Sequence, residues 1–311
     1  MAPPPSQDKL ERYKMDKMDD LFPSERPEAV LAPLGSFDRE PYTSHPAVEI
    51  RNLTFSYVPG KMAPIFTNLS VSIKKGSRCL LIGSNGAGKS TLLRVLSGMH
   101  MVPESEVLVF GKSAFHDTFF SNQNVSFLGE AWSRSVAYVG NGVPYSADIT
   151  VADMIRNRQG VEARRCEYLI SLLDVDTTWR MHEVSDGQRK RVMILLKMLR
   201  PFSLLLLDEV TTHLDVISRL DFLNFLKEES ECRGVTIVYA THIFDGMEDW
   251  ASDLIHLSHG KVIKQGPKSD FSALEDYKSR GLSAPLLRLV THWLRAEREE
   301  EKKALEAKSK Q

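Results

Sequence analysis

Short segments in which apolar and polar side chains alternate appear first along the patterned part of the chain. Residues 48–57 and 65–73 both show this alternation, which is typical of strands with one buried face. Pro59 and Gly60 break the pattern between them. We therefore expect two short antiparallel strands ahead of the rest of the fold.

Three continuous apolar runs follow, and they predict strands that are buried on both faces. These runs are residues 79–82, 204–207 and 235–240. Helical periodicity lies between and after them, at 90–99, 161–173, from 186 onward and from about 216 to 229. Strands alternating with helices predict an α/β fold with a parallel sheet. The polar, helical pattern of residues 124–190 predicts a helical subdomain inserted into it.

The two ends of the chain differ from this middle part. Residues 1–46 hold eight of the fifteen prolines and few large apolar groups, which predicts a disordered tail. A short helix over residues 10–22 is the alternative there. At the other end, residues 271–311 form an expected helical extension in which an apolar face (Leu286, Leu289, Val290, Trp293) precedes a charged run. We expect this face to dock on the same chain, with another protein as the alternative, and residues 47–270 to form the main domain.

Composition excludes several classes of protein. The 311 residues carry a formal net charge of −1, which gives no global attraction to nucleic acid or to an anionic membrane. The three cysteines, Cys79, Cys166 and Cys232, are far apart, so a disulfide framework and a cysteine zinc site are not indicated. No apolar run is long enough to span a bilayer, and no signal peptide is evident. We expect a soluble cytoplasmic protein, with the nucleus as the alternative compartment.

The run at 79–82 leads directly into a phosphate-binding motif of the form GxxxxGK[ST] at residues 83–90. Glycines let the backbone approach phosphate oxygens, and the following helix presents its positive dipole end. Lys89 is expected to reach the β- and γ-phosphates of a nucleotide, and the Ser90 hydroxyl to hold Mg²⁺. The expected nucleotide-binding residues here are Gly83, Ser84, Asn85, Gly86, Ala87, Gly88, Lys89, Ser90 and Thr91.

Further polar residues follow the ends of the other predicted strands. Asp208 and Glu209 end the run at 204–207; Asp208 suits Mg²⁺ binding, and Glu209 suits activation of a water beside the γ-phosphate. His242 follows the run at 235–240, where ligands bind in parallel α/β sheets. Ser185 and Asp186 begin a helix whose N-terminus is a second anion site. Tyr57 either stacks on a nucleobase or is a structural tyrosine.

Taken together, these motifs resemble those of the ATP-binding cassette (ABC) ATPases across about residues 47–265. The resemblance rests on the loop at 83–90, VSDGQ at 184–188, LLLLDE at 204–209, HLD at 213–215 and ATH at 240–242. More narrowly, residues 179–182, 204–216 and 239–246 resemble the soluble single-cassette proteins of plant ABC subfamily I. They are also similar to the fungal cassette protein associated with the messenger-RNA deadenylase and transcription regulatory complex.

The resemblance implies a P-loop fold with an antiparallel β subdomain and a helical subdomain. It also implies ATP and Mg²⁺ as ligands, and a second cassette that binds head to tail and is either a copy of this chain or a related cassette. Tyr57 would then stack on adenine, Glu209 would be the general base, and His242 would sense the γ-phosphate. Ser185, Gly187 and Gln188 would cap the ATP of the opposite subunit, and Asp215 would contact that subunit.

Three positions differ from the usual transporter cassette and affect which function we expect. Gly140 or Asn141 stands where a glutamine usually reaches the metal and lines the groove for a membrane partner, Val210 replaces a proline, and Asp186 replaces a glycine. We expect an ATPase that regulates a protein complex and does not bind nucleic acid directly. The alternatives are the nucleotide-binding subunit of a split transporter and a nucleotide-gated scaffold with little hydrolysis.

Overall fold

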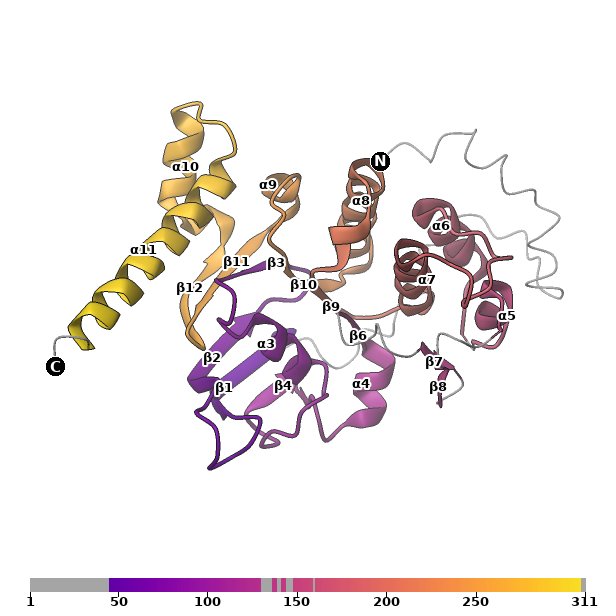
Figure 1. Ribbon diagram of the computed structural model, residues 1–311, viewed down its shortest axis with the longest axis horizontal. Coiled ribbons are helices and arrows are strands. Elements are labelled where there is room, and N and C mark those ends of the chain that lie inside the picture. The colour runs from indigo at the N-terminus through magenta and orange to yellow at the C-terminus, as the bar shows by residue number, and fades with distance from the viewer. Residues whose placement is uncertain (1–44, 130–135, 139–140, 144–147, 159, 309–311) are drawn as a thin grey trace.

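A computed structural model (Figure 1) describes residues 45–129, 136–138, 141–143, 148–158 and 160–308. The first sheet is antiparallel, with strand order β2-β1-β4-β5. Along β1 and β2, apolar side chains on one face are buried while most polar neighbours are exposed, as the alternation predicts. The strands are β1 (Val48–Phe55), β2 (Phe66–Ile73), β4 (Val107–Val109) and β5 (Lys112–Ser113).

The second sheet has the order β12-β11-β3-β10-β9-β6 and is parallel except for β12, which pairs antiparallel with β11. Every residue of β9 and of β10 is buried, so these strands are covered on both faces, as their continuous apolar runs predict. The strands are β3 (Arg78–Ile82), β6 (Val125–Leu128), β9 (Leu204–Asp208), β10 (Thr236–Ala240), β11 (Asp253–Ser258) and β12 (Lys261–Pro267). A small pair joins β7 (Val136–Tyr138) to β8 (Asn141–Val143).

The helices complete the layers around the second sheet. In Figure 1, α3 lies beside the antiparallel sheet, whereas α5, α6 and α7 form a separate helical part. The helices that cover the core are α3 (Lys89–Leu96), α4 (Thr118–Asn124), α5 (Val151–Arg156), α6 (Ala163–Leu173), α7 (Asp186–Met198), α8 (Val216–Arg233), α9 (Met247–Trp250), α10 (Ser272–Ser279) and α11 (Pro285–Lys308). Two 3₁₀ turns, η2 (Val210–His213) and η3 (Lys268–Asp270), follow β9 and β12.

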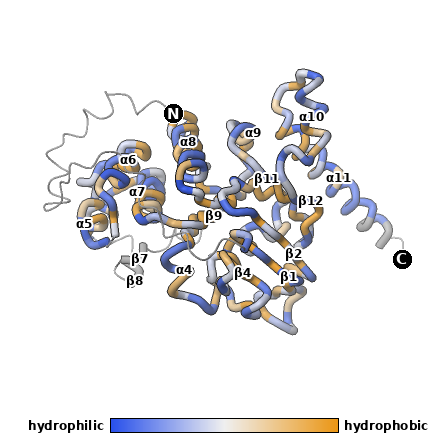
Figure 2. The backbone as a smooth tube through the Cα atoms, turned by 180° about the vertical axis from the view of Figure 1, so that it is seen from behind, coloured by the Kyte–Doolittle hydropathy of each residue, from blue (hydrophilic) through white to orange (hydrophobic). Residues whose placement is uncertain are grey.

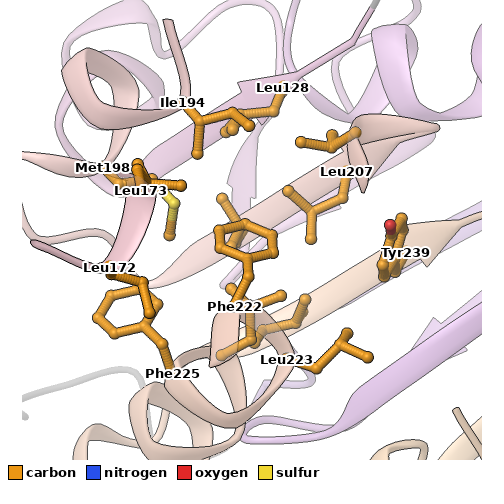
Figure 3. Close-up of a cluster of buried hydrophobic side chains, with 14 of the residues drawn as sticks. Leu128, Leu172, Leu173, Ile194, Met198, Leu207, Phe222, Leu223, Phe225 and Tyr239 are labelled. Atoms are coloured by element: carbon orange, nitrogen blue, oxygen red, sulfur yellow. The ribbon is translucent and has the colours of Figure 1, made fainter. Parts of the chain in front are cut away.

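Two hydrophobic clusters lie on opposite faces of the parallel sheet. Alternate residues of β9 supply each cluster: Leu205 and Leu207 pack with α6, α7 and α8, whereas Leu204 and Leu206 pack with α3 and the antiparallel sheet. Figure 3 shows part of the first cluster, in which Phe222 and Leu223 of α8 lie below Leu207. This division makes the parallel sheet the layer that fixes α3 and the loop before it.

The structure corrects the expected start of the helical subdomain at residue 124. Residues Val125–Leu128 form β6, which pairs in register with Leu204–Leu207 of β9. A segment of four residues is too short for periodicity to separate a strand from a helix, and its strand pairing buries Phe127 and Leu128 on the two faces of the sheet. Helices of the insertion begin at α5. The predicted N-terminal tail and its alternative short helix fall almost entirely on residues 1–44, outside the described residues.

Docking of the C-terminal extension on the same chain is confirmed. Leu286, Leu289, Val290 and Trp293 are buried in the first cluster. The Trp293 ring stacks on His256 of β11, with 4.9 Å between ring centroids. Figure 2 shows hydrophilic residues over the distal part of α11, which extends away from the body. The apolar half of the helix is thus part of the fold, and the charged half projects.

Candidate functional site

The loop between β3 and α3 has the backbone shape that the phosphate-binding motif requires. Gly88 caps α3 with φ of 106°, in the left-handed region that favours glycine. A Cβ on Gly83 would lie 2.2 Å from the Leu257 carbonyl oxygen, and one on Gly88 would lie 2.7 Å from the Phe66 ring. Side chains are therefore excluded at both positions, and the loop is held against β11 and β2.

Lys89 begins α3 and turns back over this loop. Its Nζ donates hydrogen bonds to the carbonyl oxygens of Gly83, at 2.7 Å, and Ser84, at 2.9 Å. Burial lowers the pKa of Lys89, and the negative charges of Glu209 and Asp208 oppose that shift. The ammonium group therefore stands at the centre of the loop with acidic groups nearby, where a polyphosphate would meet it.

Asp208 and Glu209 lie at the carboxyl end of β9, the strand that is adjacent to β10 in the sheet. Asp208 is the last, buried residue of the strand, whereas Glu209 adopts a left-handed backbone with φ of 53°. The Glu209 amide donates to the Ala240 carbonyl oxygen at 3.0 Å, which ties the two strand ends together. Burial raises the pKa of the Glu209 carboxyl, a shift that the backbone N–H of His242 opposes. A carboxylate with raised proton affinity is suited to accept a proton from water.

His242 faces Glu209 from the end of β10. Its Nε2 lies 3.4 Å from Glu209 Oε1, and its backbone N–H points to Oε2 at 3.4 Å. Burial lowers the pKa of His242, with Lys89 adding to the effect, so the imidazole is neutral at pH 7. A neutral ring offers one donor and one acceptor. Glu209 Oε1 is buried without a hydrogen-bond partner among the described residues, and it is therefore available to a bound molecule.

Sheet order explains why these groups meet. Strands β3, β10 and β9 are adjacent and parallel, so the phosphate loop, His242 and Glu209 all follow carboxyl ends on one edge of the sheet. Within the described part of the chain no cluster of three or more His, Cys, Asp or Glu residues could hold a metal alone. The two residues expected to hold Mg²⁺, Ser90 and Asp208, carry a hydroxyl and a carboxylate, which are the oxygen donors that Mg²⁺ takes together with phosphate oxygens.

Tyr57 lies beside this loop with 41% of its surface exposed. Its hydroxyl is 3.0 Å from the Thr91 hydroxyl on α3. The edges of Phe55, at 5.5 Å, and His100, at 5.1 Å, fix the ring in T-shaped contacts. The structure thus places a rigid, partly exposed aromatic ring next to the phosphate loop, as stacking on a nucleobase requires.

The signature-like residues lie elsewhere. Ser185 caps α7 and forms a capping box with Gln188. The Ser185 hydroxyl oxygen accepts from the backbone N–H of Gln188 at 3.2 Å, and the Gln188 side-chain oxygen accepts from the backbone N–H of Ser185 at 2.9 Å. In Figure 1, α7 lies in the helical part, and β9 and β6 lie between it and α3. The structure therefore does not bring Ser185, Gly187 and Gln188 to the chain's own phosphate loop.

Asp215 caps α8. Its carboxylate accepts hydrogen bonds from the Ser218 amide, at 2.9 Å, and the Ser218 hydroxyl, at 2.7 Å, and these bonds lower its pKa. Arg191 of α7 lies 3.4 Å from the same carboxylate and from Asp174. Sequence reasoning missed this bridging role of Arg191, because charge pairs between segments distant in sequence give no local pattern. Of the two positions where a glutamine is expected, Gly140 is outside the described residues and Asn141 begins β8.

A buried hydroxyl pair behind Glu209 was also missed. Tyr239 of β10 and Thr211 of η2 are both buried, and their hydroxyl oxygens are 2.7 Å apart. The signal available in the sequence was a tyrosine inside an otherwise apolar strand, since a buried phenol needs a hydrogen-bond partner. The identity of that partner depends on how η2 folds back over β10.

Comparison with known proteins gives one consistent result. Residues 66–212 match the profile of the family described as "ABC transporter". The chain is 45% identical over 263 residues to "ABC transporter I family member 20" of Arabidopsis thaliana, covering 82% of this chain and 78% of that protein. It is 37% identical over 231 residues to "CCR4-associated factor 16" of Saccharomyces cerevisiae, covering 70% and 77%.

Among solved structures, the fold is similar to a dimeric ATP-binding cassette in a post-hydrolysis state bound to ADP and Pi. The TM-score is 0.58 at 20% identity, over 71% of this chain and 98% of that one. No helix in the described part of the chain combines the length and apolar character needed to cross a bilayer.

Proposed function

Because the chain belongs to the ABC family, as its relatives show, we propose that it hydrolyses ATP within a head-to-tail dimer and that this cycle regulates a protein complex. The observation that supports hydrolysis most strongly is the Glu209 carboxylate, held by the ends of two strands with one buried oxygen unpaired beside Lys89 and His242. Its place at the sheet edge shared with the phosphate loop is where a γ-phosphate would lie.

Each residue has a task that follows from its position. The loop amides and Lys89 bind phosphate oxygens, and Tyr57 orients the base. Ser90 and Asp208 would hold Mg²⁺, which supplies positive charge that neutralises the phosphates. Glu209 accepts a proton from the attacking water, and neutral His242 hydrogen-bonds the γ-phosphate.

We propose a dimer because the phosphate loop and the signature-like residues lie in different parts of one chain, so that a single chain would contact its nucleotide from one side. Ser185, Gly187 and Gln188 lie at the start of α7, which Figure 1 shows in the helical part of the chain and apart from α3. The N-terminus of a helix is the positive end of its dipole, so this end of α7 is suited to the γ-phosphate on a second copy. ATP then joins two subunits and its hydrolysis removes the link, which is the linkage expected of a ligand that binds only the closed state.

The proposed client is a protein complex in the cytoplasm. The support is the name of the yeast relative, a CCR4-associated factor, together with 37% identity over most of both chains. A split transporter subunit is the second candidate, favoured by the family description "ABC transporter". Affinity purification of tagged Glu209→Gln protein with Mg-ATP from its own cells separates the two. Stoichiometric regulatory subunits would support the first, and a stoichiometric membrane-spanning protein would refute it in favour of the second.

Hydrolysis itself is tested by phosphate release from purified protein. We expect wild type to release phosphate with saturable dependence on ATP, and Glu209→Gln to lose at least about 100-fold in kcat while still binding ATP. Lys89→Ala should lose tight ATP binding because it removes the ammonium group that lies over the loop, bonded to the Gly83 and Ser84 carbonyl oxygens. A Glu209→Gln protein as fast as wild type would contradict the assignment of the base and favour a scaffold.

A further inference from the structure

Glu209 is held in a backbone conformation that needs support. A φ of 53° is in the left-handed region, which is unfavourable for a residue with a side chain. Two bonds hold the residue locally: its amide donates to the Ala240 carbonyl oxygen at 3.0 Å, and Thr212 Oγ1 donates to the Glu209 carbonyl oxygen at 3.1 Å. Glu209 is therefore fixed by η2 on one side and by the end of β10 on the other.

A single side chain contacts both of these segments. Tyr239 is fully buried on β10, paired in register with Leu207 of β9, and its hydroxyl oxygen lies 2.7 Å from that of Thr211 in η2. Figure 3 shows its ring beside Leu207, with the hydroxyl as the one oxygen among the labelled side chains. Burying both hydroxyls is unfavourable unless they hydrogen-bond to each other, so this hydrogen bond stabilises the packing of η2 on β10.

Thr211 lies in η2, and η2 begins directly after Glu209, so this contact joins the segment that follows Glu209 to β10. On the other side, the buried Thr241 directly follows β10, and its hydroxyl oxygen accepts from the Ile243 amide at 3.1 Å. The Tyr239 hydroxyl therefore holds η2, and with it the backbone of Glu209, against the end of β10.

We propose that Tyr239 is a positioning residue for ATP hydrolysis, whose buried hydroxyl anchors Thr211 of η2 and so holds Glu209 toward the γ-phosphate. This inference rests on the proposed function, since it assigns Glu209 as the base. The ring itself is held separately, edge-on against Trp250 at 5.9 Å, so the hydroxyl can be removed without displacing the ring.

The test is steady-state phosphate release by Tyr239→Phe. Without the hydroxyl, η2 and the carboxylate lose their anchor while the phosphate loop is unchanged. We expect kcat to fall about 10-fold, because a misplaced catalytic group loses rate without loss of binding, and KM for ATP to stay within about twofold of wild type. Tyr277→Phe, which removes the hydroxyl of a partly buried tyrosine on α10, is the matched control and should leave both constants unchanged.

Two further comparisons separate positioning from general loss of stability. Thr211→Val should reproduce the Tyr239→Phe defect, whereas Thr211→Ser keeps the hydroxyl and should stay within about twofold of wild type. If Tyr239 acts through Glu209, Tyr239→Phe in a Glu209→Gln background should cause no further fall in the residual rate. Should Tyr239→Phe not fold, the Thr211 pair decides the question in its place.

The outcomes are distinct for the two proposals. Glu209-dependent hydrolysis by wild type together with an unchanged kcat in Tyr239→Phe or Thr211→Val would overturn the positioning role and leave the proposed function intact. An additional fall in the Glu209→Gln background, or equal defects in Thr211→Val and Thr211→Ser, would also overturn it. A wild-type protein without Glu209-dependent hydrolysis would overturn both proposals.

Discussion

The buried ion pair between Arg165 of α6 and Glu229 of α8 gives a sharp test of how the helical part is attached. Arg165 Nη1 donates to the two Glu229 carboxylate oxygens at 2.9 and 3.0 Å, and its Nε donates to the Met198 carbonyl oxygen at 2.6 Å. The two side chains are 1% and 4% exposed. Charges buried this deeply depend on each other, because neither is solvated by water.

Glu229→Gln keeps the shape of the side chain and removes its charge. We expect it to lower the free energy of unfolding by about 3–5 kcal/mol, since the Arg165 guanidinium stays buried without a counter-ion. Replacing both charges, with Arg165→Met and Glu229→Leu together, removes the more deeply buried cation; Arg233, which lies 3.2 Å from Glu229 and is 16% exposed, loses the same partner but remains in contact with water. The double variant should therefore lose about 1–2 kcal/mol, mainly because the Met198 carbonyl loses its donor.

Urea unfolding at pH 7 and 25 °C, followed by far-ultraviolet circular dichroism, measures these values. Arg156→Met is the control: it breaks an exposed pair with Asp153, at 2.7 Å with side chains 43% and 44% exposed, and should cost at most about 1 kcal/mol. The reasoning is refuted if the double variant is as unstable as Glu229→Gln, or if Glu229→Gln matches the Arg156 control.

Three other predictions concern single side chains. Tyr57→Ala should raise KM for ATP about tenfold with kcat unchanged, because base stacking is worth about 1–3 kcal/mol; an unchanged KM in phosphate-release assays would contradict the stacking role. Trp293→Ala should cost about 3–5 kcal/mol in urea unfolding, because the ring is 4% exposed and stacked on His256; a loss under about 1 kcal/mol would mean that α11 is not part of the core. The pKa of Asp215 is lowered in the folded state, chiefly by the Ser218 amide, so its contribution is present above the unfolded pKa of 3.8 and is lost as pH falls through the folded value. The stability difference between wild type and Asp215→Asn should therefore shrink below about pH 4 in urea titrations, and a difference independent of pH would disprove the linkage.

Local patterns were sufficient to predict the elements that carry the nucleotide chemistry. The apolar runs at 79–82 and 204–207 became β3 and β9, and the motif at 83–90 became a loop whose glycines lie against Leu257 and Phe66. These predictions succeeded because a buried parallel strand and a glycine-rich turn each have a strong local signal.

Contacts between distant segments could not be predicted in this way. The strand β6 was interpreted as part of a helical insertion, because four residues carry too little periodicity to separate strand from helix. The anchoring of Glu209 by Tyr239 and Thr211 depends on how η2 packs on β10, and the attachment of α6 depends on a pair 64 positions apart in the sequence. Such pairs are defined by topology, which local patterns do not specify.

The most direct test of the proposed ATP-gated dimer is the mass of Glu209→Gln protein in solution, measured by size-exclusion chromatography with light scattering. The chain mass is 35.1 kDa, so a dimer would be seen at twice that value. We predict a dimer in saturating Mg-ATP and a monomer without nucleotide, with Lys89→Ala monomeric in both conditions. A Glu209→Gln protein that binds ATP but remains monomeric would contradict the account.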